Sequence, residues 1–541
     1  MLKNLLLAIA LLAVLIGPIV MRPHGEHGTV PGEREIVIIT PHNEAIREEF
    51  ARAFAAYHLA KTGERVRVDW RTPGGTSEIA RYVASEYLSS FHQAWEAQPG
   101  RVWSTVVEQN FDNSRTTPAA MPDQDTEAQK ARRAFLNSKV GCGIDLFFGG
   151  GTFDYAQQAA AGRLVDCGFV SEHPELFNDH AIPRTLGGES YWDPEGRWIG
   201  VCLAAFGICY NTDSLGRLGI STAPSQWEDL ADARLYHEVA LANPTQSGSV
   251  NRAFELLIQQ QILLETESRK AAVNRALSPA EETEAVRTGW KRAMQLLLKI
   301  GANARYFTDS SSKISLDVAA GDAAAGMTID FYGRVQSESV ARPDGSSRLQ
   351  FVTAKGDTTF SADPIGLFRG APHPDLAREF IAWSLSEEGQ KLWDWKVGTP
   401  GGPARYALRR IPILPAVYAP EYRQFRSDPD VNPYAAAGSF SYHSGWTGPL
   451  FKPIGYIVRV MCIDPHDELT EAWHALIEAQ FPPQAMEAFL NVDAVSYDAA
   501  KGPIRDVFGP GHIQEVQLAK KLADGFRAQY RHAAELARQG K

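Results

Sequence analysis

The chain has few cysteines for its length, and none of them stands in a metal-binding arrangement. The five are Cys142, Cys167, Cys202, Cys209 and Cys462, and no two of them form a CxxC pair. This spacing argues against a disulfide framework and against a structural zinc site. A single bridge stays open in an oxidising compartment, with Cys202 and Cys209 as the candidate pair.

Positive charge is also scarce. The 54 lysines and arginines are outnumbered by 64 aspartates and glutamates, which gives a formal net charge of −10 at pH 7. Because binding along nucleic acid needs a basic surface that neutralises phosphates, we expect no nucleic-acid partner. A chain of 541 residues is too long for one hydrophobic core, so we expect two or more domains.

Motifs for nucleotide binding and for catalysis are missing. Neither GxGxxG nor GxxxxGK[ST] occurs, which disfavours nucleotide binding. The sequence has no G-x-S-x-G elbow, no HExxH and no paired carboxylates with a positioned histidine. Ser247 lies in QSGS and lacks the first glycine of an elbow. The sequence therefore predicts a binding protein rather than an enzyme.

Only the N-terminus carries a long hydrophobic run. Lys3 precedes residues 4–20, of which only Asn4, Gly17 and Pro18 are not hydrophobic. This pattern is typical of an export signal, and its length is near the lower limit of about 17 residues for a membrane span. No A-x-A cleavage site follows. We expect an exported, periplasmic protein in which residues 1–21 are a signal peptide or an inner-membrane anchor, and residues 22–34 a linker.

The folded part is expected to begin with a strand, a loop and a helix. Residues 36–39 are a continuous apolar run, typical of a strand buried on both faces of a parallel sheet. Apolar residues then recur at helical spacing through 46–57. Thr40, His42 and Asn43 lie in the loop between them. Since ligands bind at the carboxyl ends of strands in open α/β sheets, we expect this loop to border a cleft.

Three further loops join a strand end to a helix start with glycine, serine and threonine, at 72–77, 149–152 and 245–249. Glycine permits close backbone approach, and the free N–H groups of a helix start favour an anion. An ordinary helix cap is the alternative for each loop taken singly. The candidate ligand-binding residues in these loops are Gly75, Thr76, Ser77, Gly150, Gly151, Thr152, Thr245, Ser247, Gly248 and Ser249.

Two more candidates, Asp330 and Tyr332, are expected at the polar tip of a strand over 326–332. There they would face a cation or a hydroxyl group, or simply cap a turn. His42 is a possible base or metal ligand, although a lone histidine is more often structural.

Several segments in series resemble the extracellular solute-binding proteins of ABC importers, in the group that contains ferric-ion-binding proteins. They include W-x-D-L at 227–230, N-P-x-x-S-G at 243–248 and A-x-x-F-I-x-x-x-L-S-x-x-G-Q at 377–390. The resemblance covers residues 35 to about 410. It implies an α/β fold like that of type II periplasmic binding proteins, with two lobes of mixed parallel sheets joined by two crossing strands. It also implies a solute held between the lobes, hinge closure, and an ABC permease as partner.

The resemblance divides the chain into expected regions. Lobe 1 would span 35–209 with an irregular insertion at 86–140, lobe 2 would span 210–332, and the chain would return to lobe 1 over 333–414. A C-terminal extension would follow at 415–541, with a final helix over about 513–538. The two crossings are expected near 210–211 and 330–333.

The ferric-binding subgroup matches only in part. His42 matches the histidine that such proteins often use on iron. Their acidic ligand would fall near Gly150 or Gly151, and their tyrosine pair near Phe331 and Tyr332, which leaves one tyrosine. Fe³⁺ is a hard cation best held by phenolate and carboxylate oxygens, so losing two of them disfavours a bare iron site. His42 and Tyr332 are the metal ligands under that alternative.

We therefore predict a monomeric solute-binding protein without a cofactor that captures a small polar anion such as a phosphate or phosphonate compound. The first alternative is a ferric-ion-binding protein of an iron importer, in which Fe³⁺ is the cargo. The second is a membrane-anchored sensor or assembly protein that has kept the fold.

Overall fold

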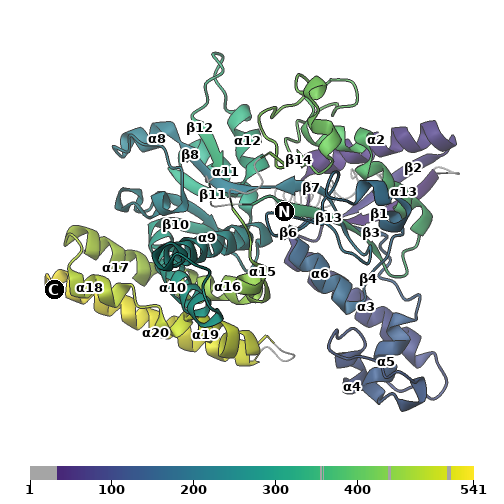
Figure 1. Ribbon diagram of the computed structural model, residues 1–541, viewed down its shortest axis with the longest axis horizontal. Helices are drawn as coiled ribbons and strands as arrows, with labels where there is room; N and C mark the ends of the chain where they lie inside the picture. Colours follow the sequence, from purple (N-terminus) through teal and green to yellow (C-terminus); the bar gives the residue numbers. More distant parts are fainter. Residues whose placement is uncertain (1–32, 354–355, 357–358, 436–439, 509–512) are drawn as a thin grey trace, which may run out of the picture.

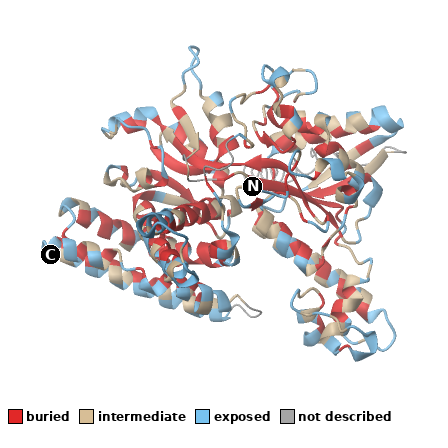
Figure 2. Cartoon of the chain, in the orientation of Figure 1, coloured by how far each residue is buried: buried red, intermediate tan, exposed pale blue. Residues whose placement is uncertain are grey.

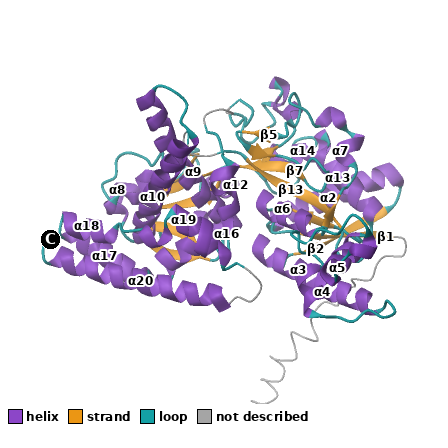
Figure 3. Ribbon diagram, turned by 60° about the horizontal axis from the view of Figure 1, so that its bottom comes forward, coloured by secondary structure: helices purple, strands orange, loops and turns teal. Residues whose placement is uncertain are grey.

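The structure is a computed structural model that describes residues 33–353, 356, 359–435, 440–508 and 513–541 (Figure 1). The expected signal or anchor at 1–21, and all but the last two residues of the expected linker, lie outside this part. Within it, no helix combines the length and the hydropathy needed to cross a membrane. Two α/β lobes lie side by side in the views of Figures 1 and 3.

The first lobe is built on a mixed sheet in the order β14-β7-β13-β3-β1-β2, with β4 paired to β13. β1 pairs in parallel with β2 and β3, whereas β13 is antiparallel to β3, β4 and β7. The strands are β1 (Glu33–Ile39), β2 (Arg65–Arg71), β3 (Leu146–Phe148), β4 (Leu164–Val165), β7 (Ile199–Ala204), β13 (Ser361–Phe368) and β14 (Ile411–Pro412).

Helices cover both faces of this sheet. Ile36 and Ile38 of β1 pack in one apolar cluster with α2 and α13, while Val37 and Ile39 pack in another with α3 and α6. The prediction of a first strand buried on both faces is therefore confirmed. The covering helices are α2 (Glu44–Thr62), α3 (Thr76–Glu96), α6 (Thr152–Ala161), α13 (Pro374–Leu385) and α14 (Glu387–Asp394).

The second lobe has its own sheet in the order β10-β9-β11-β8-β12. Its strands are β8 (Phe206–Asn211), β9 (Val239–Ala242), β10 (Ala304–Thr308), β11 (Ala325–Ile329) and β12 (Leu349–Thr353). Its helices include α8 (Thr212–Arg217), α9 (Gly248–Val273), α10 (Pro279–Asn303), α11 (Ser311–Ala320) and α12 (Asp330–Ser339).

Two chain segments connect the sheets, but not where the sequence predicted. The first crossing is at Ala205, between β7 and β8, because Phe206 already pairs with Ile329 in the second sheet. The second lies between β12 and β13, after Thr353. The predicted crossings at 210–211 and 330–333 are wrong, and the second sheet extends past 332. The sequence gives no sign of this change of sheet, because the buried strands on both sides of it form one continuous apolar run over 198–210.

The predicted irregular insertion at 86–140 is largely helical. α3 continues to Glu96, and α4 (Thr105–Asn110) and α5 (Glu127–Leu136) follow, with the 3₁₀ turn η1 (Pro122–Gln124) before α5. They project from the first lobe, with buried residues facing inward in Figure 2. The helices form because their aromatic residues pack together: Phe91 stacks on Phe111 with ring centroids 4.8 Å apart.

The expected C-terminal extension divides between the lobes. Its first part stays with lobe 1, where Arg426 pairs with Asp394 of α14 at 2.7 Å. Its later helices are α15 (Ser444–Thr447), α16 (Phe451–Val458), α17 (His466–Glu478), α18 (Pro483–Phe489), α19 (Tyr497–Ala499) and α20 (Ile513–Arg538). Of these, α15 and α16 pack on α9 and α17 and α19 pack on α10 of the second lobe, while α18 and α20 pack on each other and on α17 (Figure 3). The prediction of a long final helix is confirmed by α20.

The proposed bridge between Cys202 and Cys209 does not form. All five cysteines are free and buried. Cys202 lies on β7 in the first sheet and Cys209 on β8 in the second, so the crossing at Ala205 separates them into different sheets. Burial raises the pKa of the Cys209 thiol to about 12, which keeps it protonated.

Candidate functional site

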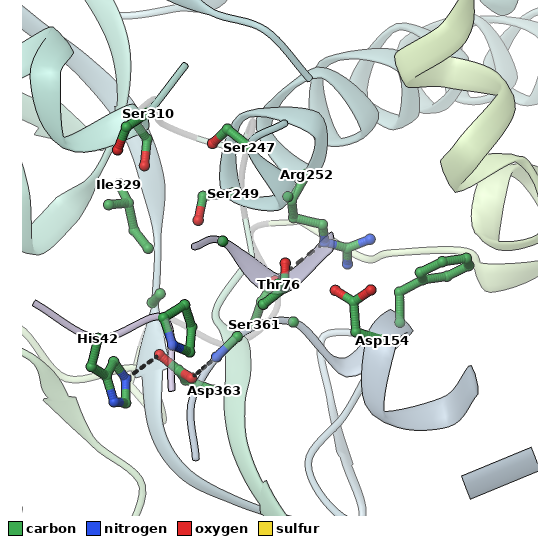
Figure 4. A pocket seen from close by; sticks show the side chains of 18 of the residues that line it. His42, Thr76, Asp154, Ser247, Ser249, Arg252, Ser310, Ile329, Ser361 and Asp363 are labelled. Atoms are coloured by element: carbon green, nitrogen blue, oxygen red, sulfur yellow. Dashed lines mark hydrogen bonds and ion pairs between the residues drawn. The ribbon is translucent and has the colours of Figure 1, made fainter. Parts of the chain in front are cut away.

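A cavity of about 530 Å³ lies between the two lobes and is lined by residues of both (Figure 4). Ala204 and Phe206 at the first crossing, and Ser361 at the second, also line it. The structure places ten of the predicted site residues there: His42, Gly75, Thr76, Gly150, Gly151, Thr152, Ser247, Gly248, Ser249 and Tyr332.

Five predicted residues do not line the cavity, and the structure gives four of them other partners. The Asn43 side chain caps α2 by accepting from the N–H of Ile46 at 3.1 Å. Thr40 Oγ1 accepts from the N–H of His42, and Thr245 Oγ1 donates to Asn243 Oδ1 at 2.7 Å. Asp330 is fully buried, 3.2 Å from Arg334 Nη1. Ser77 is the second residue of α3.

Asp330 and Tyr332 are not on a strand tip, as predicted. β11 ends at Ile329, and both residues belong to the first turn of α12. The backbone N–H of Asp330 still reaches the carbonyl of Ala205 at the crossing, at 2.9 Å. Tyr332 therefore enters the cavity from a helix start, while Asp330 faces the protein interior.

Besides α12, whose first N–H donates to Ala205, four helix starts converge on this cavity, at α3, α6, α9 and α11. The N-cap residues of α9 and α11 are Ser247 and Ser310, whose side chains accept one helix N–H each. The N-cap residues of α3 and α6 are Gly75 and Gly151, which have no side chain to do so. Since the first N–H groups of a helix have no partner within it, these donors are available to a bound anion.

The two lobes approach closely beside these helix starts. A β-carbon on Gly248 of α9 would lie 2.8 Å from Thr76 Oγ1 of α3, and one on Gly75 would lie 3.1 Å from the carbonyl oxygen of Gln246. Glycine at these positions therefore lets donors from both lobes face the same small space.

A buried charged group lies on the other side of the cavity, and its charges are satisfied internally. Asp363 forms an ion pair with Arg410, lies 3.3 Å from His42 Nε2, and accepts the N–H of Gly150 at 2.5 Å. Burial alone would raise the pKa of Asp363, but Arg410 and His42 outweigh it and lower the pKa to about 2. Burial lowers the pKa of His42, so its ring is neutral at pH 7.

Arg252 of α9 lines the cavity but is also neutralised by the protein. It pairs with Glu189 of the first lobe and Glu255 of its own helix, and its Nε lies 3.4 Å from Ser361 Oγ. Its guanidinium carbon lies 4.2 Å from the ring centroid of Tyr442. Two carboxylates around one guanidinium leave this cluster without surplus positive charge.

Asp154, in the first turn of α6, is a carboxyl group of the cavity that can gain or lose its proton near neutral pH. Burial raises its pKa to about 6, although Thr76 and Lys452 act in the opposite direction. Figure 4 shows Asp154 beside Arg252, on the side of the cavity away from His42 and Ser310. At pH 7 its negative charge would oppose an anion in the cavity.

Sequence reasoning missed several lining residues. The start of α11 follows β10 in the same strand-loop-helix pattern that identified the other three loops, so Ser310 could have been found. Asp363 and Arg410 could not, because neither belongs to a motif and their pairing joins positions far apart in sequence. Asp154, Arg252 and Phe451 carried no motif either.

The residues present do not assemble an evident metal site. Among the described residues, no group of three or more His, Cys, Asp or Glu side chains could hold a metal ion. His42 and Tyr332 do line the same cavity. Burial raises the pKa of Tyr332, which disfavours the phenolate form that iron prefers.

Comparison with known protein families finds one matching family model. Residues 143–408 match the profile of the family described as bacterial extracellular solute-binding protein. An uncharacterized protein of Haemophilus influenzae is 27% identical over 258 residues, which are 47% of this chain and 61% of that protein. The chain thus spans less than two thirds of the length of this relative.

Solved structures with similar chains were also found. AfuA of Actinobacillus pleuropneumoniae, a periplasmic binding protein with fructose-6-phosphate bound, is 17% identical, with 66% of this chain and 81% of that chain covered and a TM-score of 0.43. Iron-bound HitA of Pseudomonas aeruginosa is 14% identical, with 79% and 99% covered and a TM-score of 0.46.

The two mixed sheets, the two crossings and the family match confirm the expected type II periplasmic-binding-protein-like fold. They also confirm the resemblance that the sequence motifs indicated. Residues 143–408 of this chain therefore resemble the bacterial extracellular solute-binding protein family, whose model they match.

Proposed function

We propose that the cavity binds a small organic anion carrying a phosphate or phosphonate group. The observation that carries this proposal is the convergence of four helix starts on one cavity, two of them capped by glycine alone. Helix starts bind phosphate and carboxylate groups through free N–H donors and the helix dipole. Thr76 and Ser249 would add hydroxyl donors from the two lobes.

The charges of the cavity favour binding of the solute by backbone N–H groups rather than by the arginine side chains. Arg410 and Arg252 are each paired with carboxylates of the protein. The donors left for a solute include the N–H groups of the helix starts. A volume of about 530 Å³ lies within the range of about 300–1,000 Å³ typical of small-molecule sites and exceeds what a phosphate ion alone would fill.

Binding between two lobes offers a way to couple capture to transport. We propose that the protein acts without catalysing a reaction, outside the cytoplasm, and delivers its solute to an ABC permease. A solute that contacts both lobes stabilises their closed arrangement, which a permease can distinguish from the open one.

A thermal-unfolding screen tests the proposal. Inorganic phosphate, fructose 6-phosphate, methylphosphonate, spermidine and ferric citrate would each be added to the protein. We expect stabilisation by the phosphorus-containing anions, since a ligand at 100 times its Kd adds about 2.7 kcal/mol to the free energy of unfolding. Stabilisation by spermidine alone, or by none of these compounds, would contradict the proposal.

Ferric ion remains a second candidate cargo because His42 and Tyr332 line the same cavity. A charge-transfer band on adding ferric citrate, lost in Tyr332→Phe, would favour iron. An unchanged absorption spectrum would exclude a tyrosine-bound iron site.

A further inference from the structure

The C-terminal part of the chain reaches the solute cavity, although it lies outside the segment that matches the family. We name residues 440–452 the strap. The backbone N–H of Tyr442 donates to the carbonyl of Gly187 in lobe 1 at 2.8 Å. At the other end, the carbonyl of Phe451 accepts from Asn251 Nδ2 of α9 in lobe 2, also at 2.8 Å. The strap therefore runs from one lobe to the other.

One face of α9 is built to hold the strap. Asn251, Glu255 and Gln259 are spaced four residues apart, so they share one helix face, and all three are buried. Gln259 exchanges two hydrogen bonds with the backbone of His443, at 2.8 and 3.0 Å. Glu255 accepts from the hydroxyls of Tyr442 and Thr447, at 2.8 and 2.7 Å.

Buried polar side chains need hydrogen-bond partners, and the strap supplies these. The strap is therefore an integral part of the second lobe rather than a loosely attached tail. α9 is also the helix whose first turn, with Gly248 and Ser249, lines the cavity.

The last residues of the strap close one side of the cavity. The ring of Phe451 lies 4.6 Å from that of Phe153, centroid to centroid, with an interplanar angle of 30°. Both residues line the cavity, and Phe153 stands next to Asp154 in the first turn of α6. This ring contact joins lobe 1 to the extension of lobe 2 on the Asp154 side.

We propose that Phe451 is a specificity-determining residue of the solute site and selects an organic anion over free phosphate. This inference rests on the proposed function. The helix starts would hold the anionic group, while the rings of Phe451 and Phe153 would pack against the carbon-bearing part of the solute. Inorganic phosphate has no such part, so it gains nothing from the aromatic pair.

Calorimetric titration of Phe451→Ala with fructose 6-phosphate and with inorganic phosphate tests this selectivity. We expect the affinity for fructose 6-phosphate to fall about tenfold or more, while that for inorganic phosphate changes less than about twofold. Phe508→Ala is the matched control, since Phe508 is an extension aromatic that packs on Tyr456 and does not line the cavity. Equal losses for both anions, or no loss for either, would overturn the proposal.

A second measurement needs no solute. Spin labels on Gln157→Cys in α6 and Ser268→Cys in α9, both exposed, would report the distance between the lobes. We expect Phe451→Ala to broaden the distance distribution of the ligand-free protein, because it removes the ring contact. An unchanged distribution would overturn the role of the strap. If the distance distribution broadens but the protein binds no anion, the proposed function is refuted, while the role of the strap in joining the lobes is supported.

Discussion

The two sides of the cavity use polar groups in opposite ways. On one side, Asp363, Arg410 and His42 are buried and bonded to one another. On the other, Gly75 and Gly151 begin helices whose first N–H groups receive no side-chain cap. The charges of the first side are paired within the protein, although among the described residues His42 Nδ1 and Arg410 Nε have no hydrogen-bond partner. The first N–H groups of α3 and α6, by contrast, have no side-chain cap.

This difference separates stability from binding. A charged residue in a binding cavity invites the interpretation that it binds the solute, but here its partners are protein groups. The neutral glycine loops, which look like ordinary helix caps, carry the unsatisfied donors. Substitutions on the two sides should therefore affect different measurements.

The largest effect is expected from Arg410→Met. It leaves Asp363 buried beside the neutral His42, and breaking a buried ion pair costs about 3–5 kcal/mol. We expect the free energy of unfolding in urea to fall by that amount, while the affinity for fructose 6-phosphate in the folded protein changes less than about threefold. A large loss of affinity without loss of stability would mean that Arg410 binds the solute. The difference between the charged side of the cavity and the helix starts would then not hold.

The pH dependence of stability checks the same pair. The pKa of Asp363 is lowered to about 2 in the folded protein, so its stabilising contribution is present above its unfolded pKa near 4 and is lost as the pH falls toward 2. Wild type should lose this contribution over that interval. Arg410→Met should show a smaller change there.

The next effect is expected from Gly151→Asp. The new carboxylate would cap α6 and occupy the N–H donors, so the affinity for fructose 6-phosphate should fall by about 2–3 kcal/mol. The thermal stability of the ligand-free protein should stay the same or rise. Gly151→Ala is the control, since a β-carbon there meets no atom within 4 Å. Unchanged binding by Gly151→Asp would mean that α6 does not hold the anion.

The smallest effect is expected from Asp154→Asn, which removes a negative charge beside the cavity. We expect about threefold tighter binding of fructose 6-phosphate at pH 7.5, with the difference from wild type vanishing near pH 5. Comparing both proteins at each pH cancels the titration of the solute. A difference that persists at pH 5 would show that charge is not the cause.

The same substitution has a defined effect on stability. Burial raises the folded pKa of Asp154 to about 6, so the charged form destabilises the folded protein above that pH. Asp154→Asn should therefore be more stable than wild type at pH 7.5. This advantage should fade as the pH falls from 6 toward 4, which chemical unfolding at several pH values would measure.

Local patterns in the sequence predicted the parts of the fold that depend on local structure. The first strand, three of the four helix-start loops and the final helix follow from apolar periodicity and glycine-rich turns. The family motifs added the two-lobed fold. Ten of the predicted site residues share one cavity because helix starts at strand ends meet at the same edge of their sheets.

The remaining features depend on contacts between distant residues. The pairing of Asp363 with Arg410 and the contact of Phe153 with Phe451 have no local signature. The crossing at Ala205 lies inside one apolar run, and no change in the hydrophobic pattern of the sequence marks its position. Asn251, Glu255 and Gln259 are buried polar residues of α9, and their hydrogen bonds to the strap join positions far apart in the sequence.

Hydrogen exchange measured with and without fructose 6-phosphate tests the central claim most directly. If four helix starts bind one anion, the backbone amides at 76–79, 152–155, 248–251 and 311–314 should exchange more slowly together when the sugar phosphate is added. Protection confined to one lobe, or found only outside these four segments, would contradict a shared anion site between the lobes.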